Sequence, residues 1–162
     1  MALETYYDFA ENDFKFLRDI INEGRFCNGL ASMSQNVCER YLKHIIDAYY
    51  IPDNQEKSDK KTNILKAHNL NKICKFIKNE MNIFISEECQ HAAKVIDGFY
   101  FTARYPGDES VDIDIEDMKD CLNAMNMCKA ETDRIIELIN NNIKQEECLD
   151  FEENSENDEI EF

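Results

Sequence analysis

Residues 99–107 read Phe-Tyr-Phe-Thr-Ala-Arg-Tyr-Pro-Gly, and they end an apolar, aromatic run that is typical of a helix. Proline has no backbone N–H and disfavours helix at the residue before it, so Pro106 and Gly107 predict a break. We therefore expect Arg104 near a helix C-terminus, where the helix dipole favours a cation. No other basic residue in the chain has a position that the neighbouring residues predict so clearly.

Apolar residues at helical spacing lie on both sides of this stretch. They predict helices over about residues 3–22, 26–50, 69–84, 86–104 and 114–142. The second of these has an apolar arc wide enough to lie at the centre of a bundle. Residues 52–63 are polar throughout and predict a mobile loop. The fold expected is an all-α bundle of about five helices, mostly antiparallel.

The charge of the chain is concentrated at its C-terminal end. The 162 residues carry a net charge of −16, and residues 145–162 contain nine acidic residues and no Lys or Arg, which leaves −7 for the rest. We expect residues 1–143 to form the bundle and residues 144–162 to form an acidic tail, too poor in apolar residues to pack and therefore disordered. An acidic body repels phosphate backbones, so broad DNA binding is not expected.

Cysteine usage and the apolar runs indicate the compartment. The seven cysteines include no CxxC pair, the first residues do not resemble a signal peptide, and no apolar run approaches the roughly 20 residues that cross a bilayer. We expect a reduced, cytoplasmic protein without membrane contact. Cys89 and His91 lack zinc spacing and no glycine-rich phosphate loop occurs, so no metal and no cofactor are predicted.

Three separated stretches together match one family pattern. A small-residue helix runs from Gly29 to Glu39-Arg40-Tyr41-Leu42-Lys43, the triplet His68-Asn69-Leu70 opens another helix, and Ala103-Arg104-Tyr105-Pro106-Gly107-Asp108 follows the fourth. In this order they resemble the HEPN family of helical domains, over roughly residues 3–142. The resemblance implies a bundle of four or five helices that commonly forms a homodimer.

The resemblance implies two kinds of function. Some HEPN proteins are metal-independent ribonucleases that use an Arg and a His separated by four to six residues, together with the same pair of the partner subunit. Others lack the pair and bind nucleotides or partner proteins, often beside a small nucleotidyltransferase of a toxin–antitoxin pair. Here the positions that would hold the histidine are Glu109, Ser110 and Val111. We therefore favour a noncatalytic binding and assembly module in a bacterial toxin–antitoxin or defence setting, which engages a partner protein or a nucleotide.

The candidate site residues follow from these two hypotheses. Arg104 and Tyr105 are candidates for contacting a phosphate, because a guanidinium fork fits phosphate oxygens. Lys43 and Arg40 are candidates beside them, with helix-surface ion pairs as the alternative. The competing hypothesis is a ribonuclease that cleaves RNA with Arg104 and a non-standard histidine, His44 or His68, because an imidazole changes charge near pH 6.5.

Overall fold

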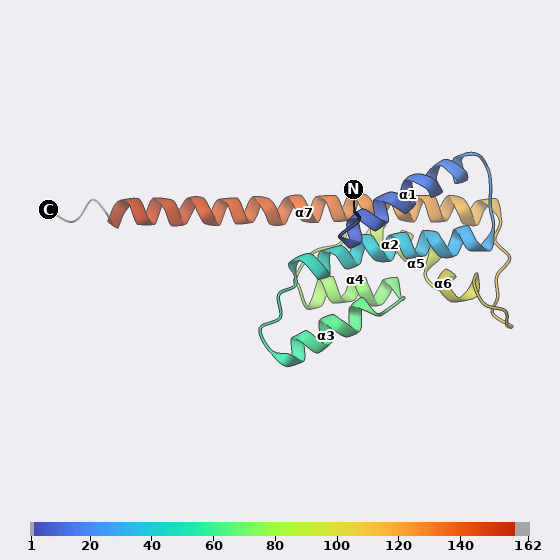
Figure 1. Ribbon diagram of the computed structural model, residues 1–162, viewed down its shortest axis with the longest axis horizontal. Helices are drawn as coiled ribbons and strands as arrows, with labels where there is room; N and C mark the ends of the chain where they lie inside the picture. The colour runs from blue at the N-terminus through green and yellow to red at the C-terminus, as the bar shows by residue number, and fades with distance from the viewer. Residues whose placement is uncertain (1, 158–162) are drawn as a thin grey trace.

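The computed structural model describes residues 2–157, and side-chain surroundings as far as Glu146. Within these residues the chain is helical, without strands (Figure 1). The helices are α1 Tyr6–Asn22, α2 Asn28–Tyr49, α3 Gln55–Leu65, α4 Leu70–Asn79, α5 Glu87–Ile96, α6 Phe99–Thr102 and α7 Ile115–Asn157. The all-α bundle expected from the sequence is confirmed, with α3 as an element that the sequence did not predict and with α5 and α6 in place of the single helix predicted over residues 86–104.

Helix α2 lies at the centre of the bundle, as its wide apolar arc predicts. It contacts every other helix, most extensively α7 and α1. Val37, Tyr41, Leu42 and Ile45 of α2 are fully buried. Helix α7 runs along the bundle, where several of its side chains between Met118 and Ile135 are fully buried, and then extends past the other helices (Figure 1).

The predicted helix ends are set by local hydrogen bonds. Asn69 accepts the backbone N–H of Lys72 at 2.8 Å and begins α4, and Ser86 accepts the N–H of Cys89 at 3.3 Å and begins α5. Side-chain oxygens at N-caps satisfy backbone donors that have no partner inside the helix. The starts predicted for these two helices, near residues 69 and 86, are therefore confirmed.

The loop predicted over residues 52–63 is wrong, because α3 occupies most of it. Asn54 caps this helix by accepting the N–H of Lys57 at 2.8 Å. Lys61 donates to the carbonyls of Asp47 and Tyr50 at 2.8 and 2.9 Å, at the C-terminal end of α2, where a cation is favoured. The apolar pattern misses α3 because this helix buries none of its side chains fully and is fixed by polar contacts.

Two other predicted helices are shorter than expected. α4 ends at Asn79, and Asn82 takes a left-handed conformation with φ of 57°, so the expected extension to Phe84 is wrong. The run predicted from Ser86 to Arg104 is interrupted at Asp97 and Gly98, where φ of Gly98 is 102°. Asp97 leaves the helix because its carboxylate accepts the N–H groups of Leu70 and Asn71 at 2.9 and 3.1 Å, at the start of α4.

The acidic segment after residue 143 continues α7 as helix to Asn157. Residues 158–162 lie outside the described residues, so the predicted division into a bundle and a disordered tail stays a prediction. Within the described part of the chain, no helix has the length and apolarity that a membrane crossing requires.

Candidate functional site

Arg104 lies two residues beyond the single turn of α6, where its backbone N–H donates to the carbonyl of Phe101 at 3.2 Å. Its side chain is exposed. The guanidinium carbon lies 4.8 Å from the centre of the Tyr100 ring and 5.9 Å from that of Tyr105, within the range of cation–π attraction. On the α2 side, Arg104 borders an open hollow of about 410 Å³ whose wall includes Gly29, Ser32, Met33 and Asn36.

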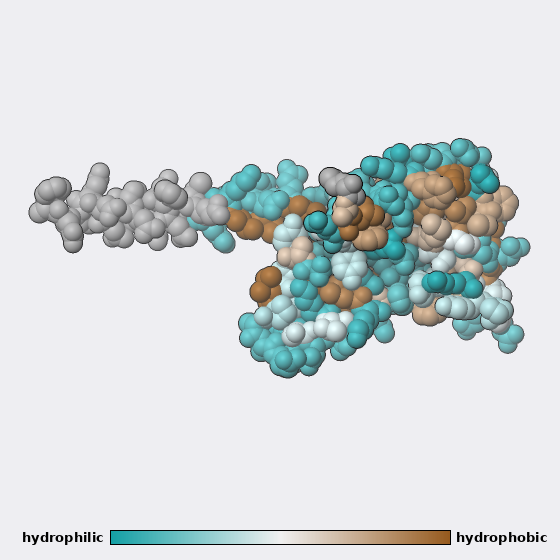
Figure 2. All heavy atoms as spheres, viewed as in Figure 1, coloured by the Kyte–Doolittle hydropathy of each residue, from teal (hydrophilic) through white to brown (hydrophobic). Residues whose placement is uncertain are grey.

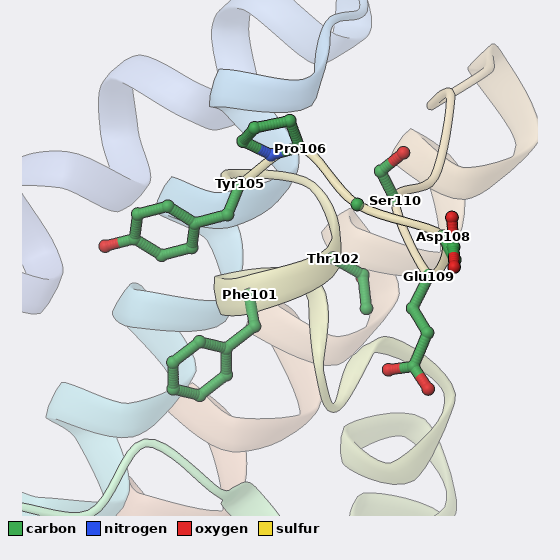
Figure 3. Close-up of a pocket in the computed structure, with 8 residues that line it drawn as sticks. Phe101, Thr102, Tyr105, Pro106, Asp108, Glu109 and Ser110 are labelled. Atoms are coloured by element: carbon green, nitrogen blue, oxygen red, sulfur yellow. The ribbon is translucent and has the colours of Figure 1, made fainter.

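Aromatic rings surround this arginine. The rings of Tyr100 and Phe101 meet edge to face at 5.0 Å, and those of Phe101 and Tyr105 lie 6.4 Å apart. Phe101 and Tyr105 are 55% and 54% exposed, which is unusual for large apolar side chains. Figure 3 shows both rings on the same side of the turn, with Asp108 and Glu109 on its other side. An exposed cation among exposed rings can hold a phosphate and stack on a base.

His68 is connected to Arg104 through Tyr100. We use the name Arg104 cluster for Arg104, the three rings around it, and His68, Glu39, Lys43 and Gln35. The two rings are stacked, with centres 4.0 Å apart and an angle of 7° between their planes. Nδ1 of His68 lies 3.2 Å from Oε2 of Glu39, and the same oxygen accepts from Nζ of Lys43 at 3.1 Å. Glu39 and Lys43 are 2% and 5% exposed. Arg104, His68 and Lys43, all three predicted as site residues, are thus joined through Tyr100 and Glu39.

A buried amide holds the cluster together. Gln35 is fully buried in α2, donates to the carbonyl of His68 at 2.7 Å and accepts the N–H of Tyr100 at 2.6 Å. Both ends of its side chain are therefore satisfied by backbone groups, as a buried polar group requires. Gln35 fixes the residues that carry the stacked rings.

The other two candidates, Arg40 and His44, lie on the side of α2 that faces α1. Arg40 pairs with Asp13, and its guanidinium carbon lies 5.6 Å from the centre of the Phe9 ring. The ring of His44 packs edge to face on Tyr7 at 5.5 Å. Burial lowers the pKa of His44 from its usual value, against the opposing attraction of nearby carboxylates. Neither side chain joins the Arg104 cluster.

The loop after Arg104 is tied to the start of α2. The side chain of Asn28 donates to the carbonyl of Val111 at 2.6 Å and accepts the N–H of Ile113 at 3.0 Å. Glu109 and Ser110 are exposed beside a hollow of about 310 Å³ under Phe101 and Tyr105. In the described residues, no group of three or more His, Cys, Asp or Glu side chains could hold a metal ion.

Sequence reasoning missed two residues of the cluster. Tyr100 lies in the aromatic run that predicts a helix, and nothing in that pattern indicates that its ring contacts both Arg104 and His68. Gln35 is not among the predicted site residues, although it lies on an apolar stripe of the central helix together with Cys38 and Leu42. A glutamine in such a stripe is a usable signal, because buried polar side chains need specific partners.

Comparison with protein-family models gives a match over residues 3–136, to the family described as HEPN domain. No match was found among curated proteins or among solved structures. The matched range takes in α1 to α6 and the first half of α7, and it therefore includes every residue of the Arg104 cluster.

Proposed function

Because the chain belongs to the HEPN domain family, we propose that it is a noncatalytic binding and assembly module whose Arg104 cluster engages a nucleotide or a partner protein. Within this proposal the module is a cytoplasmic homodimer of bacterial origin. A nucleotidyltransferase-type protein in a toxin–antitoxin or defence system is the partner that the family setting favours.

The exposed Arg104 guanidinium, set against Tyr100 and Tyr105 and next to Phe101, is the observation that carries the proposal. Base stacking on an aromatic ring contributes about 1–3 kcal/mol per base, and charge-assisted hydrogen bonds to phosphate add to it. The net charge of −16 opposes a long polyanion. A mononucleotide or a short single strand therefore fits this surface better than duplex nucleic acid.

The residues after Arg104 favour binding over catalysis. Glu109, Ser110 and Val111 stand where the ribonuclease arrangement needs an imidazole. Glu109 would repel a scissile phosphate, and Val111 is held in backbone contact with Thr102 at 2.9 Å. None of the three side chains is an imidazole, the group whose ordinary pKa near 6.5 suits proton transfer at neutral pH.

The experiment is a thermal-shift titration with ATP, AMP and a short oligouridylate. A ligand at a hundredfold excess over its dissociation constant should stabilise the protein by about 2.7 kcal/mol. We expect Arg104→Ala to lose this shift. Arg18→Ala is the matched control, because Arg18 is also an exposed arginine near an aromatic ring, Phe14, but lies on α1. A shift that persists in Arg104→Ala would refute nucleotide binding at this cluster.

A metal-independent ribonuclease is the second candidate, and one contact favours it. Arg104 and His68 both touch the Tyr100 ring, and Glu39 contacts Nδ1 of His68, as an orienting carboxylate does in catalytic histidine pairs. Cleavage of a mixed-sequence RNA in EDTA, lost in both Arg104→Ala and His68→Ala, would establish this activity. No cleavage by the purified dimer would leave the binding module as the better account.

A further inference from the structure

An apolar groove lies at the opposite end of α2 from Arg104. It is an open space of about 810 Å³ between the end of α2, the segment after α4, and α7, and its wall consists of Ala48, Tyr49, Tyr50, Ile51, Glu80, Met81, Ile83, Ile139 and Ile143. The Arg104 hollow uses Gly29 to Asn36 of the same helix. At about 1.5 Å per residue, the twelve residues from Asn36 to Ala48 separate the two surfaces by about 18 Å.

The groove exposes aliphatic side chains to water. Ile51 is 77% exposed and Ile143 is 46% exposed. Figure 2 shows hydrophobic residues gathered along α7 where this helix leaves the bundle, and a further hydrophobic surface over the segment after α2. Contiguous apolar surface rimmed by polar residues commonly marks a site of interaction with another molecule.

One wall of the groove also contains an unsatisfied polar group. Tyr50 is 8% exposed, its ring packs edge to face on Phe76 at 5.0 Å, and its buried hydroxyl has no hydrogen-bond partner within the described residues. A buried hydroxyl without a partner costs about 1–3 kcal/mol. Because this hydroxyl is closed to solvent, it belongs to the body of the wall, and the exposed aliphatic side chains form the contact surface of the groove.

The charges next to the groove indicate which kind of polypeptide can bind there. Glu146 is exposed one turn beyond Ile143, and it is the first of the nine acidic residues of positions 145–162, a segment without Lys or Arg. In the groove itself, Glu80 already pairs with Lys60 at 3.6 Å. Six of these nine acids lie on α7, so the α7 helix of a second copy would place six further acids against the first six. A basic occupant instead gains from the same charges.

We propose that this groove binds an amphipathic, basic helix of a partner protein. The apolar side of that helix covers Ile51 and Ile143, and its Lys and Arg side chains face the acidic continuation of α7. Such helix-in-groove recognition places apolar anchors at helical spacing into an apolar channel. The proposal goes beyond the ligand at Arg104, because it concerns a separate surface and a different chemistry.

The test measures fluorescence anisotropy of a labelled Leu/Lys peptide of about 18 residues, a length sufficient for a helix, with the full chain. A Leu/Glu peptide of the same pattern is the charge control. We expect Ile51→Asp and Ile143→Asp each to weaken binding of the Leu/Lys peptide at least about tenfold, the loss of roughly one buried isoleucine contact. Tyr50→Phe, which keeps the ring, should leave binding unchanged, because the Tyr50 hydroxyl is closed to solvent.

The controls separate the groove from general attraction to an acidic protein. The substitutions to Asp add negative charge, so attraction by net charge alone predicts equal or tighter binding. Phe16→Asp adds the same charge at a side chain of α1 that is 55% exposed, and it should retain wild-type binding. Arg104→Ala should also retain it, so that loss of nucleotide binding and loss of peptide binding stay distinguishable.

Three results would overturn the proposal. The first is equal binding of the Leu/Lys peptide by wild type, Ile51→Asp and Ile143→Asp. The second is equal binding of the Leu/Lys and Leu/Glu peptides. The third is a dimer, measured by light scattering, that Ile143→Asp converts to monomer, because a second copy would then cover the groove.

Discussion

At the scale of single residues, Gln35 shows most clearly how one position of the sequence determines the geometry of the candidate site. Its amide is fully buried in α2, and it bridges the backbone of His68 to that of Tyr100, two residues far apart in the chain. No apolar side chain of similar size can satisfy that carbonyl and that N–H. The stacking of His68 on Tyr100 therefore depends on a residue whose hydrogen bonds reach the backbones of these two residues.

Gln35→Ala should lower the free energy of unfolding by about 2–4 kcal/mol, because it leaves a buried donor and a buried acceptor without partners. Urea denaturation measures this change. Gln55→Ala is the control: Gln55 donates only to Asp59 on exposed α3, and its loss should stay within about 0.5 kcal/mol. Equal effects of the two substitutions would contradict the role assigned to Gln35.

His44 makes stability depend on pH. Burial lowers its pKa below the usual 6.5. As pH falls below about 6.5, the unfolded chain takes up a proton at this position before the folded chain does, so folding stability falls. Above about 6.5 both states are neutral at this residue and the effect disappears.

We therefore expect His44→Gln to flatten the fall in the free energy of unfolding between about pH 7 and pH 5. Urea denaturation of wild type and variant at each pH gives the two curves, and their difference isolates His44 from the other titrating groups. Parallel curves would show that His44 does not contribute to the pH dependence.

At the scale of elements, the break between α5 and α6 places the site. Asp97 accepts two N–H groups at the start of α4, and Gly98 follows with φ of 102°. A left-handed residue with a side chain costs about 1–2 kcal/mol, which glycine avoids. The turn redirects the chain so that Tyr100 meets His68, and an unbroken helix would not follow this path.

Gly98→Ala should accordingly destabilise the protein by about 1–2 kcal/mol, although a Cβ there meets no atom within 4 Å. Gly29→Ala is a matched control, because Gly29 is helical and its Cβ would lie an ordinary 3.8 Å from Sγ of Cys27. That control should be neutral or stabilising by at most about 1 kcal/mol. Thermal denaturation compares them, and a tolerated alanine at position 98 would refute the argument from φ.

At the scale of the whole molecule, one core joins α1, α2, α4, α5 and α7, and it buries several thiols. Cys38, Cys74, Cys89, Cys121 and Cys128 are all at most 2% exposed, whereas Cys27 is exposed. Burial raises the pKa of Cys74 and of Cys121 to about 12. A thiol that is both buried and protonated does not react, because the thiolate is the nucleophile.

Alkylation with iodoacetamide, mapped by mass spectrometry, should modify Cys27 quickly in the native protein. The five buried cysteines should react only after urea unfolds the chain, with a midpoint that coincides with the loss of helical circular dichroism. Cys27→Ala should leave that midpoint unchanged, because the Cys27 side chain makes no cap hydrogen bond at the start of α2. Early modification of Cys74 or Cys121 in the native state would show that the core opens locally.

The sequence by itself determined the all-α class, the central place of α2 and the starts of α4 and α5. Apolar spacing and N-cap side chains are local signals, and they act over a few neighbouring residues. The tertiary structure alone decided the helical state of α3, the break at Asp97 and the joining of Arg104, His68 and Lys43 through Tyr100 and Glu39. These features depend on hydrogen bonds and ring contacts between residues far apart in the chain, such as the 29 positions between Glu39 and His68, and no periodicity within one segment encodes them.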